Sequence, residues 1–422
     1  MNKLKAIVDV DSCYTSCEQI FNPRYRNRAM VVLSNNDGAC IAVNRLAKEA
    51  GVTKFSPFFE VKQLCEQKGI IVRSSNYELI ADTSSRLMAT LERFSPEIFP
   101  YSVDECFISF DRCEKVISNY SEYGQMIRQT VWREVRLPVS IGFGSTLTLS
   151  KVANRIAKKK PELRGVCCID GEDDRVFALK LLDISDVWGV GRRLTKRLKE
   201  EFKINTAFEL SQMDPSLGQR LFSVEMERLI LELNGIPAKY WDQARSAKQQ
   251  IFSTRSFSKK VTDFEELKQA LRSHCVTVAR KARAQGSLCK SVLIFASSSP
   301  YGRTPFYVKE LISLPSPTSS TLELCTAISL VAQKLYRNGV AYSKAGVGAI
   351  ELVSERNQQQ DLFNQSNANP ALMKAVDLVN NKYGKNTVFV AGQGIEQSWS
   401  MKRNMLSPQY TSRWSDIPKI KC

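Results

Sequence analysis

The stretch IFPYSVDECFISF, residues 98–110, contains two short apolar runs that meet at an adjacent pair of acids, Asp104 and Glu105. The flanking residues are aromatic or β-branched, so we predict two strands that form a hairpin with the acidic pair at its tip. Adjacent side chains on a strand point to opposite faces, so both carboxylates can serve one site only if the backbone bends there. Two carboxylates at a strand end suit a magnesium site that acts on phosphates, and a solvated acidic turn is the plain alternative.

A second pair of acids, Asp9 and Asp11, ends the first apolar strand, which we predict over residues 4–11. Alternation places both acids on one side of this strand and its valines on the other. A buried strand rarely carries carboxylates unless they bind something. Asp11 suits the N-cap of a helix that starts near Ser12, but this leaves Asp9 without a structural role.

The composition indicates a folded, multidomain protein that binds a polyanion. The chain of 422 residues exceeds the usual size of one domain, and 43% hydrophobic residues suffice for folded cores. Lys and Arg outnumber Asp and Glu by 60 to 43, a formal net charge of +17 that favours nucleic acid or an anionic surface as partner. No apolar run is long enough to cross a membrane, and the N-terminus leads directly into a strand. We therefore expect no membrane partner and a cytoplasmic location.

The 12 cysteines and the single histidine argue against several kinds of site. No Cys-x-x-Cys pair is present, and His274 alone cannot complete a Cys₂His₂ zinc site. A single histidine also argues against a His-dependent catalytic triad. Most cysteines lie in apolar contexts, so we expect reduced core residues.

The order of the expected elements predicts a multidomain α+β protein. In the first 160 residues, strands and helices alternate around the acidic hairpin, which predicts helices packed on a mixed sheet, interrupted by an insertion over residues 21–73. A helical, basic part follows residues 170–174, and a small α/β module follows a polar linker at 241–250. The expected strands are 4–11, 29–34, 40–43, 98–101, 106–110, 139–144, 251–257, 290–297 and 344–352, and the expected helices are 44–52, 76–94, 122–136, 150–160, 264–283 and 321–338.

The helical part contains the motif WGVGRRLTKRL at residues 188–198. Two glycines one residue apart, between helices, form a tight turn whose backbone N–H groups can approach a phosphate at a helix N-terminus. We interpret this motif as a helix-hairpin-helix that grips a DNA backbone independently of sequence, with a plain helix connection as the alternative. The residues that we assign to DNA contact are Gly189, Gly191, Arg192, Arg193 and Lys196.

Two short segments complete the candidates. Arg45 and Lys48 lie three residues apart in the helix expected over 44–52, so they share one face, which on its own is an ordinary solvated surface. Leu362 and Phe363 form an isolated apolar anchor within a polar stretch that we expect to be disordered.

Together these residues resemble the Y-family translesion DNA polymerases, and within that family the branch that includes the catalytic subunit of bacterial DNA polymerase V. The resemblance spans nearly the whole chain, and it rests on the order in which several short motifs follow one another. These motifs are DVD at 9–11 with Tyr14, VLSNNDG at 32–38, SNYEL at 75–79, SVDE at 102–105, DVWGVGRR at 186–193, VAGQGI at 390–395 and MKRNMLSP at 401–408.

The resemblance implies a right-hand polymerase and a domain order. The implied domains are a palm at 1–20 and 74–168, small fingers at 21–73, a helical thumb with the helix-hairpin-helix at 169–242, an α/β little finger at 251–353, a flexible linker at 354–369 and a C-terminal segment at 370–422.

The resemblance also implies the catalytic residues. By position, Asp9, Asp104 and Glu105 match the metal-binding carboxylates of the family, with the backbone carbonyl of Val10 as a further ligand. Two Mg²⁺ ions would clamp an in-line displacement at the α-phosphate of a nucleotide, and magnesium prefers hard oxygen ligands such as these. The implied enzyme is a template-directed, error-prone DNA polymerase of the SOS response to DNA damage, which adds deoxynucleotides to a primer 3′-hydroxyl.

Four residues match contacts to the incoming nucleotide. Tyr14 matches the steric gate, whose ring would clash with a ribose 2′-hydroxyl. Lys48 and Lys158 match basic contacts to the triphosphate, and Arg45 stands where many members carry a tyrosine. The preceding Cys13 replaces an aromatic residue common in the family, which puts the tuning of sugar discrimination in question.

Two further residues, near the start of the basic helix expected over 150–160, differ from the family pattern. Leu147 and Ser150 replace the usual lysine and alanine of the family, which puts a DNA contact at this position in question.

The resemblance implies several partners besides primer–template DNA and dNTP. The segment Gln359-Gln360-Asp361-Leu362-Phe363 resembles the peptide by which bacterial polymerases bind the beta sliding clamp, with Leu362 and Phe363 filling an apolar pocket and Gln359 and Asp361 flanking them. The C-terminal segment implies contact with a UmuD′ dimer and, through the assembled complex, with RecA.

Two other functions compete with a polymerase. A nucleotidyl cyclase uses a related palm with paired carboxylates, but the paired-glycine turn, the basic blocks and the clamp-like peptide argue against it. A non-catalytic DNA-binding scaffold would be favoured by loss of any one of Asp9, Asp104 or Glu105, and all three are present.

Overall fold

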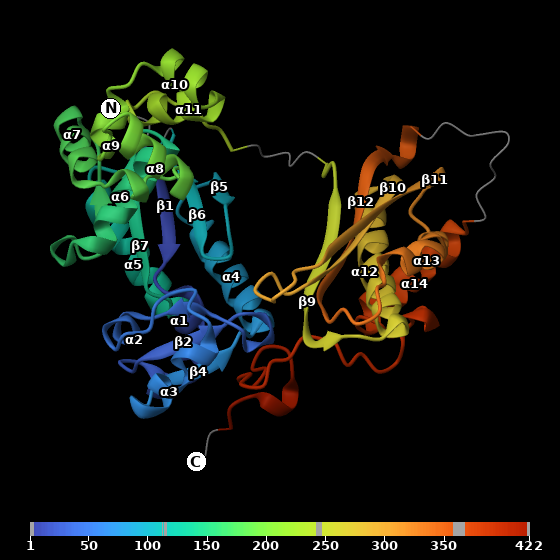
Figure 1. The fold of residues 1–422 in the computed structure, drawn as a ribbon. Coiled ribbons are helices and arrows are strands. Elements are labelled where there is room, and N and C mark those ends of the chain that lie inside the picture. The colour runs from blue at the N-terminus through green and yellow to red at the C-terminus, as the bar shows by residue number, and fades with distance from the viewer. Residues whose placement is uncertain (1–3, 112, 114–115, 242–246, 358–367, 420–422) are drawn as a thin grey trace. The chain divides into compact units, whose positions relative to one another are not determined.

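The computed structural model (Figure 1) describes residues 4–111, 113, 116–241, 247–357 and 368–419. The chain gathers into two compact units, which are called unit 1 and unit 2 below. Unit 1 contains Met1–Ser34, Gly38–Ala244 and Met405–Cys422, and unit 2 contains Asn35–Asp37 and Arg245–Asn404. Apart from the three residues Asn35–Asp37, the chain therefore enters unit 2 once, before Arg245, and leaves it once, after Asn404.

The larger sheet of unit 1 has five strands in the order β5-β6-β1-β7-β8. Neighbouring strands are antiparallel except for β7 and β8, which are parallel. The strands are β1 (Lys5–Val10), β5 (Ile98–Pro100), β6 (Glu105–Ser109), β7 (Val139–Gly144) and β8 (Val166–Cys168). The predicted first strand and the predicted acidic hairpin, formed by β5 and β6, are both confirmed, and they pair with each other through β1 and β6.

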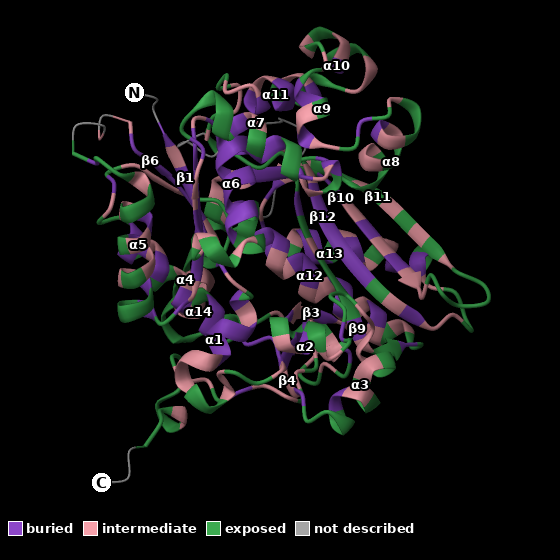
Figure 2. Cartoon of the chain, turned by 90° about the vertical axis from the view of Figure 1, so that its left-hand side faces the viewer, coloured by how far each residue is buried: buried purple, intermediate pink, exposed green. Residues whose placement is uncertain are grey.

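The two faces of this sheet have different roles. The register places Asp9 opposite Glu105 and Ile7 opposite Phe107, so these four side chains share one face. Helix α6 covers that face, whereas α4 and α5 pack on the other, over the valines of β1. Figure 2 shows β1 and α6 largely buried and the outer sides of α5 exposed. These helices are α4 (Tyr77–Leu91), α5 (Tyr120–Val135) and α6 (Leu147–Lys159).

Helix α6 lies very close to the sheet because β7 carries glycines where the helix crosses it. A Cβ atom added at Gly142 would lie 2.1 Å from the backbone nitrogen of Asn154, so no larger residue fits without moving the helix. The side chain of Thr146 caps the helix, which therefore begins at Leu147, earlier than predicted, and it ends just before Pro161. This close packing sets where the basic side chains of α6 meet the sheet.

A smaller sheet of order β3-β2-β4 forms within the predicted insertion. Strand β2 is antiparallel to β3, and it is parallel to β4, a strand that was not among those expected. Asn44 caps the helix that follows β3 by accepting a hydrogen bond from the N–H of Ala47 (2.9 Å), and this helix is shorter than predicted. The elements are β2 (Met30–Leu33), β3 (Cys40–Val43), α2 (Arg45–Glu49), α3 (Phe58–Gln67) and β4 (Ile71–Ser74).

The helical part of unit 1 shares a hydrophobic core with the inner residues of α6. Its helices are α7 (Glu172–Leu181), α8 (Arg192–Glu201), α9 (Ala207–Ser211), α10 (Pro215–Leu221) and α11 (Val224–Leu233), and α1 (Cys13–Phe21) follows β1 at the start of the chain.

Unit 2 is built on a four-stranded antiparallel sheet of order β11-β10-β12-β9, against which α12 and α13 pack. The strand β11 was not predicted, because Pro315 and Pro317 argue against a strand, but it lies at the edge of the sheet, where proline is tolerated. The predicted helix over 321–338 ends at Val331 and continues as a 3₁₀ turn, Ala332–Leu335. The elements are β9 (Ile251–Val261), α12 (Phe264–Gln285), β10 (Ser287–Ser298), β11 (Tyr307–Thr318), α13 (Thr321–Val331), β12 (Tyr342–Ser354) and α14 (Pro370–Tyr383).

The last part of the chain returns to unit 1 and lies against α1 and the start of α4. The N–H of Ser74 donates to the carbonyl of Met405 (3.0 Å), and the N–H of Met405 donates to the hydroxyl of Ser74 (2.9 Å). Tyr410 stacks on Phe21, with 4.7 Å between the ring centroids. We call residues 405–410 the C-terminal clasp.

A buried polar cluster holds the centre of the clasp. The hydroxyl of Ser407 donates to the carboxylate of Glu18 (2.9 Å) and accepts a hydrogen bond from the side-chain amide of Asn76 (2.9 Å). All three residues are buried, and burial raises the pKa of Glu18 to about 7. The clasp therefore supplies hydrogen-bond partners to two buried polar side chains, Glu18 and Asn76.

The described cysteines are all free thiols, and most of them are buried, as expected of core residues. Among the described residues, no helix combines the length and the apolar character needed to span a bilayer.

Candidate active site

The predicted carboxylates Asp9, Asp104 and Glu105 converge where β1 and β6 meet. Asp9 and Glu105 are direct partners in the strand register, and the N–H of Val10 donates to the carbonyl of Asp104 (2.9 Å). Burial raises the pKa of Asp9 well above its ordinary value, the ammonium of Lys158 opposes this rise, and the negative charges of Glu105 and Asp104 add to it. The three carboxylates therefore share one electrostatic environment.

The backbone bends at the tip of the hairpin, as predicted. The N–H groups of Tyr101 and Ser102 both donate to the carbonyl of Glu105 (2.9 and 3.1 Å), and the hydroxyl of Ser102 donates to the carboxylate of Asp104 (2.6 Å). The turn lets Asp104 and Glu105, which are adjacent in sequence, both lie near Asp9.

Two lysines of α6 approach the carboxylates from the face that the helix covers. The ammonium of Lys158 contacts Asp9 and lies 3.7 Å from Asp11, and the ammonium of Lys151 lies 2.7 Å from Glu105. The two lysines are seven residues, or about two turns, apart and so share one helix face. Lys158 was predicted as a site residue and Lys151 was not, although its spacing from Lys158 was a usable signal.

Asp11 is held by a neighbouring strand and does not cap the helix. The hydroxyl of Ser140 on β7 donates to both oxygens of Asp11 (2.9 and 3.1 Å), and Ser12 occupies the N-cap position of α1. The reading of Asp11 as an N-cap is therefore wrong, because the chain turns at Ser12 in a left-handed conformation (φ 48°) and carries the Asp11 side chain towards β7. Burial raises the pKa of Asp11.

The donor set of this cluster suits a hard divalent cation. Carboxylate oxygens are the ligands that Mg²⁺ prefers, and in this structure the negative charges of Glu105 and Asp9 are paired with the ammonium groups of Lys151 and Lys158. In the part of the chain that the structure describes, no three Asp, Glu, His or Cys side chains are already gathered tightly enough to hold one ion. The carboxylates would have to turn away from the two lysines to share a metal.

The predicted gate residue, Tyr14, lies on α1 directly after β1. Its ring meets that of Tyr77 edge-on, with 6.5 Å between centroids and an interplanar angle of 88°. Burial raises the pKa of Tyr14, and the charge of Asp104 is among the smaller causes, so the phenol lies within electrostatic reach of the carboxylates.

Arg45 and Lys48 both lie on α2 with exposed side chains. Arg45 forms an ion pair with Glu49 (2.9 Å). Among the described residues, no hydrogen bond or ion pair joins Arg45 or Lys48 to the carboxylates, so their assignment stays a prediction.

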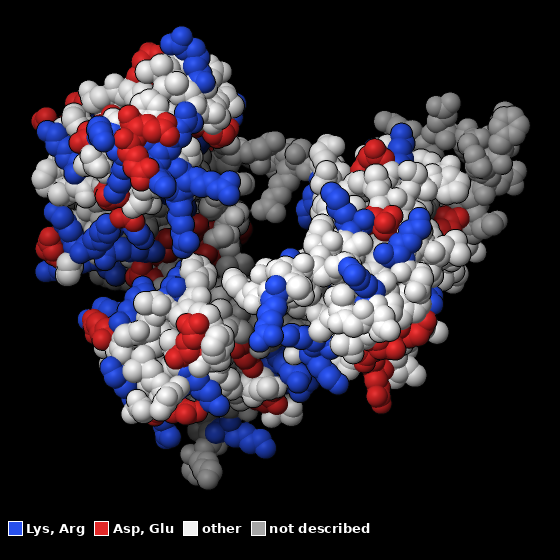
Figure 3. All heavy atoms as spheres, viewed as in Figure 1, with Lys and Arg blue, Asp and Glu red and all other residues white. Residues whose placement is uncertain are grey.

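The paired-glycine motif forms a tight turn that leads into α8. Gly189 has a φ of +97°, a conformation that favours glycine, and Gly191 is the N-cap of the helix. The element directly before the turn is a single 3₁₀ turn, Ile184–Asp186, rather than an α-helix, and the DNA contact of this motif stays a prediction. Arg192 and Arg193 are exposed in the first turn of α8, and Lys196 lies 3.9 Å from Glu200. On the face drawn in Figure 3, basic side chains are spread widely over the surface, as the net charge of +17 requires.

The predicted clamp-binding residues, Gln359, Asp361, Leu362 and Phe363, lie outside the described residues.

Most of the chain matches known protein families and proteins. Residues 8–155 match the impB/mucB/samB family, residues 248–362 match the C-terminal domain of that family, and residues 370–420 match a domain of unknown function, DUF4113. The chain is 39% identical to Protein UmuC of Salmonella typhimurium over 422 residues, which cover 99% of this chain and 100% of that protein. It is 36% identical to Protein MucB of Escherichia coli over 98% of each chain. It is 24% identical to DNA polymerase IV of Pelotomaculum thermopropionicum, over 91% of this chain and 94% of that protein.

A solved structure supports the fold. A Y-family DNA polymerase chimera of Dbh and Dpo4 superposes with a TM-score of 0.64 at 17% identity, over 83% of this chain and 99% of the chimera. The predicted multidomain α+β fold is therefore confirmed. The chain belongs to the impB/mucB/samB family, in the UmuC branch of the Y-family DNA polymerases, and is a DNA-directed DNA polymerase.

Proposed function

We propose that this polymerase carries out error-prone translesion synthesis in the SOS response to DNA damage. The full-length similarity to Protein UmuC supports this role. The pairing of Asp9 with Glu105 on adjacent strands, with Asp104 at the hairpin tip beside them, supports the chemistry of nucleotide addition. The implied domain boundaries, from the palm at 1–20 and 74–168 to the C-terminal segment at 370–422, form part of the same proposal.

The carboxylates of Asp9, Asp104 and Glu105, with the carbonyl of Val10, would hold two Mg²⁺ ions. The chemistry that such ions supply when bound is activation of the primer 3′-hydroxyl and neutralisation of the charge on the triphosphate. Lys158, released from Asp9, is then free to pair with phosphate oxygens of the incoming dNTP.

The neighbouring Lys151 has a second set of contacts that keeps it in place. Its ammonium lies 4.8 Å from the ring centroid of Tyr101 and 5.2 Å from that of Trp188. We assign Lys151 a positioning role, because these rings hold its charge next to Glu105.

Replacing Tyr14 by alanine should raise the insertion of ribonucleotides relative to deoxynucleotides by about 10-fold or more. The ring would no longer fill the space that a ribose 2′-hydroxyl needs, and steric discrimination of this kind is worth roughly 1–3 kcal/mol. Single-nucleotide insertion with matched rNTP and dNTP measures this selectivity.

Tyr14→Phe provides the matched control, because it keeps the ring and removes only the hydroxyl. It should retain nearly all of the sugar selectivity. Equal selectivity in Tyr14→Ala and the unchanged protein would refute the gate assignment.

We also propose that Gln359, Asp361, Leu362 and Phe363 bind the beta sliding clamp, and that the C-terminal segment contacts a UmuD′ dimer and RecA. Replacement of Leu362 and Phe363 by alanine should weaken clamp binding without changing synthesis in the absence of clamp, because the apolar pair would no longer fill its pocket. Surface-immobilised clamp measures the affinity, and unchanged affinity would contradict this assignment.

The function as a whole is tested by synthesis past an abasic site. The purified chain is assayed on a primed template with Mg²⁺, with and without UmuD′ and RecA. We expect bypass products that extend beyond the lesion. Extension on undamaged DNA with no bypass under any of these conditions would refute the translesion role while leaving the polymerase activity intact.

A further inference from the structure

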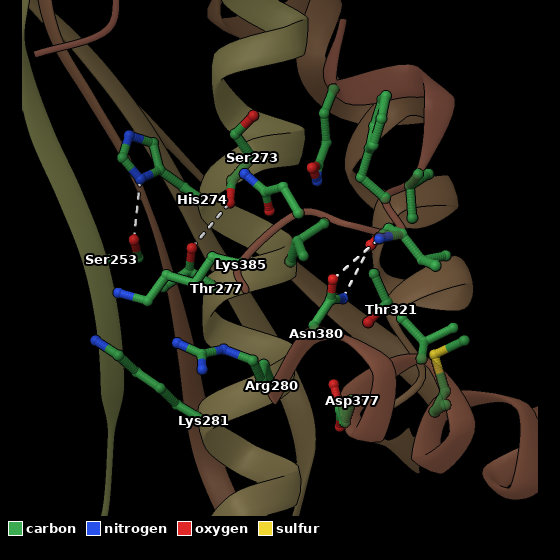
Figure 4. A pocket seen from close by; sticks show the side chains of 18 of the residues that line it. Ser253, Ser273, His274, Thr277, Arg280, Lys281, Thr321, Asp377, Asn380 and Lys385 are labelled. Carbon is green, nitrogen blue, oxygen red and sulfur yellow. Dashed lines mark hydrogen bonds between the residues drawn. The ribbon is translucent and has the colours of Figure 1, made fainter. Parts of the chain in front are cut away.

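Unit 2 contains a pocket of about 810 Å³ that has no part in the site described above. It lies between β9, α12 and the segment that runs from α14 to Trp399 (Figure 4). Every residue that lines it belongs to unit 2. Its volume falls within the range of small-molecule sites, roughly 300–1,000 Å³.

Four basic side chains line one part of this pocket: Arg255, Arg280, Lys281 and Lys385. In the view of Figure 4, the nitrogen ends of Arg280, Lys281 and Lys385 are all turned towards β9. Arg255 lies on β9 itself, on the same face as Ser253 by strand alternation. The pocket therefore gathers positive charge from three separate segments of the chain.

This charge is not neutralised within the described residues. No carboxylate there forms an ion pair with any of the four cations, and Asp377, which alone supplies a carboxylate to the lining, is bound by both ends of the Arg283 guanidinium (2.7 and 2.9 Å). Like charges held close together without a counter-ion destabilise a fold, so such a cluster favours an anionic ligand.

A neutral polar pair lies beside the cations. His274 is buried, and its Nδ1 lies 3.0 Å from the hydroxyl of Ser253. Burial, together with the charge of Arg255, lowers the pKa of His274 to about 4, so the ring is neutral near pH 7. Its Nε2 has no hydrogen-bond partner among the described residues.

Besides neutral polar residues, the lining includes large apolar side chains that are incompletely covered. Leu372 and Phe389 are 44% and 45% exposed, although each is a large hydrophobic side chain. A ligand that fits this lining has an anionic end for the cations and an aromatic or aliphatic body for these side chains.

We propose that this pocket binds an organic phosphate monoester with an aromatic or apolar body, such as a 5′-mononucleotide. The phosphate would lie among Arg255, Arg280, Lys281 and Lys385, because guanidinium and ammonium groups form charge-assisted hydrogen bonds with phosphate oxygens. The body would cover Leu372 and Phe389. The proposal does not depend on the role assigned to the carboxylates of unit 1.

Isothermal titration calorimetry of the full-length chain with AMP tests the proposal. EDTA in the buffer removes divalent ions, so that nucleotide binding at the carboxylates of unit 1 is suppressed. We expect one AMP per chain, and weaker binding of inorganic phosphate or adenosine alone, because each supplies only half of the contacts.

Variants locate the site. Lys281→Glu, an exposed position, should weaken AMP binding about tenfold or more, because it replaces an attractive charge with a repulsive one. The matched control is Lys334→Glu, an exposed lysine of the same unit that does not line the pocket, and it should leave the affinity unchanged. Phe389→Ala should weaken AMP binding but not the binding of inorganic phosphate.

Three results would overturn the proposal: no AMP binding at millimolar concentration, equal affinity of the Lys281→Glu variant and the unchanged chain, or equal loss in Lys281→Glu and Lys334→Glu. If Lys281→Glu weakens primer–template binding while AMP fails to bind, the cations belong to a DNA-binding surface and the pocket is not a monoester site.

Discussion

Replacing Asp104 by alanine should lower the rate of nucleotide incorporation by about 10³-fold or more, which corresponds to about 4 kcal/mol of transition-state stabilisation. Asp104 lies at the hairpin tip, where its charge contributes to the raised pKa of Asp9. Its removal would take away one of three carboxylates that can compensate a divalent cation, and metal stabilisation of developing charge is worth several kcal/mol. The substitution should slow the chemical step and leave the affinity for DNA nearly unchanged. DNA affinity depends on the whole basic surface, to which Asp104 contributes only one charge.

Single-turnover incorporation on a gapped template with Mg²⁺ measures the rate, and fluorescence anisotropy measures the affinity for the same DNA. Asp173→Ala is the matched control: it removes an exposed carboxylate from the first turn of α7, away from the hairpin. We expect near-normal rates for this control and near-normal DNA affinity for both variants. Undiminished incorporation by Asp104→Ala would refute the proposed mechanism.

A chain that ends at Asn404 should unfold at a temperature roughly 5–10 °C below that of the full chain. It lacks the clasp, so Glu18 and Asn76 lose their partner Ser407, and Phe21 loses the ring of Tyr410. Unsatisfied buried polar groups cost about 1–3 kcal/mol each, and about 1 kcal/mol shifts the midpoint by roughly 2–4 °C in a domain of this size.

Thermal unfolding followed by circular dichroism at pH 7 measures this difference. A chain that ends at Ile417 is the control, because it keeps the clasp and Asp416, which accepts a hydrogen bond from the N–H of Gln409 (2.8 Å). Its midpoint should match that of the full chain. If both truncated chains unfold together with the full chain, the clasp adds nothing to the stability of unit 1.

The elements that could be predicted from the sequence are those whose signals are local. The first strand and the acidic hairpin were predicted because apolar alternation ends in acids at both places, and the basic helix because it is long and bounded by Pro161. Strand β11 was missed because its prolines read as breakers, and only the finished sheet shows that it lies at an edge.

The contacts that could not be predicted join residues far apart in the chain. Asn76 meets Ser407, and Lys151 meets Glu105 only because glycine at position 142 lets α6 lie close to β7. Such contacts depend on how elements pack, and no local pattern reports packing. The family resemblance predicted a functional role for Lys158, but it did not predict which residues the clasp would contact.

The path of the chain makes unit 2 an insertion within unit 1, rather than an appendage at its end. Segments of unit 1 precede and follow the inserted stretch, Arg245–Asn404, in the chain. The clasp binds the segment that returns to unit 1. A single break at the first junction would therefore leave the two pieces associated as a split enzyme. An exchange of unit 2 between related polymerases would likewise need two matched junctions, since a fusion made only at the first would replace the clasp along with the domain.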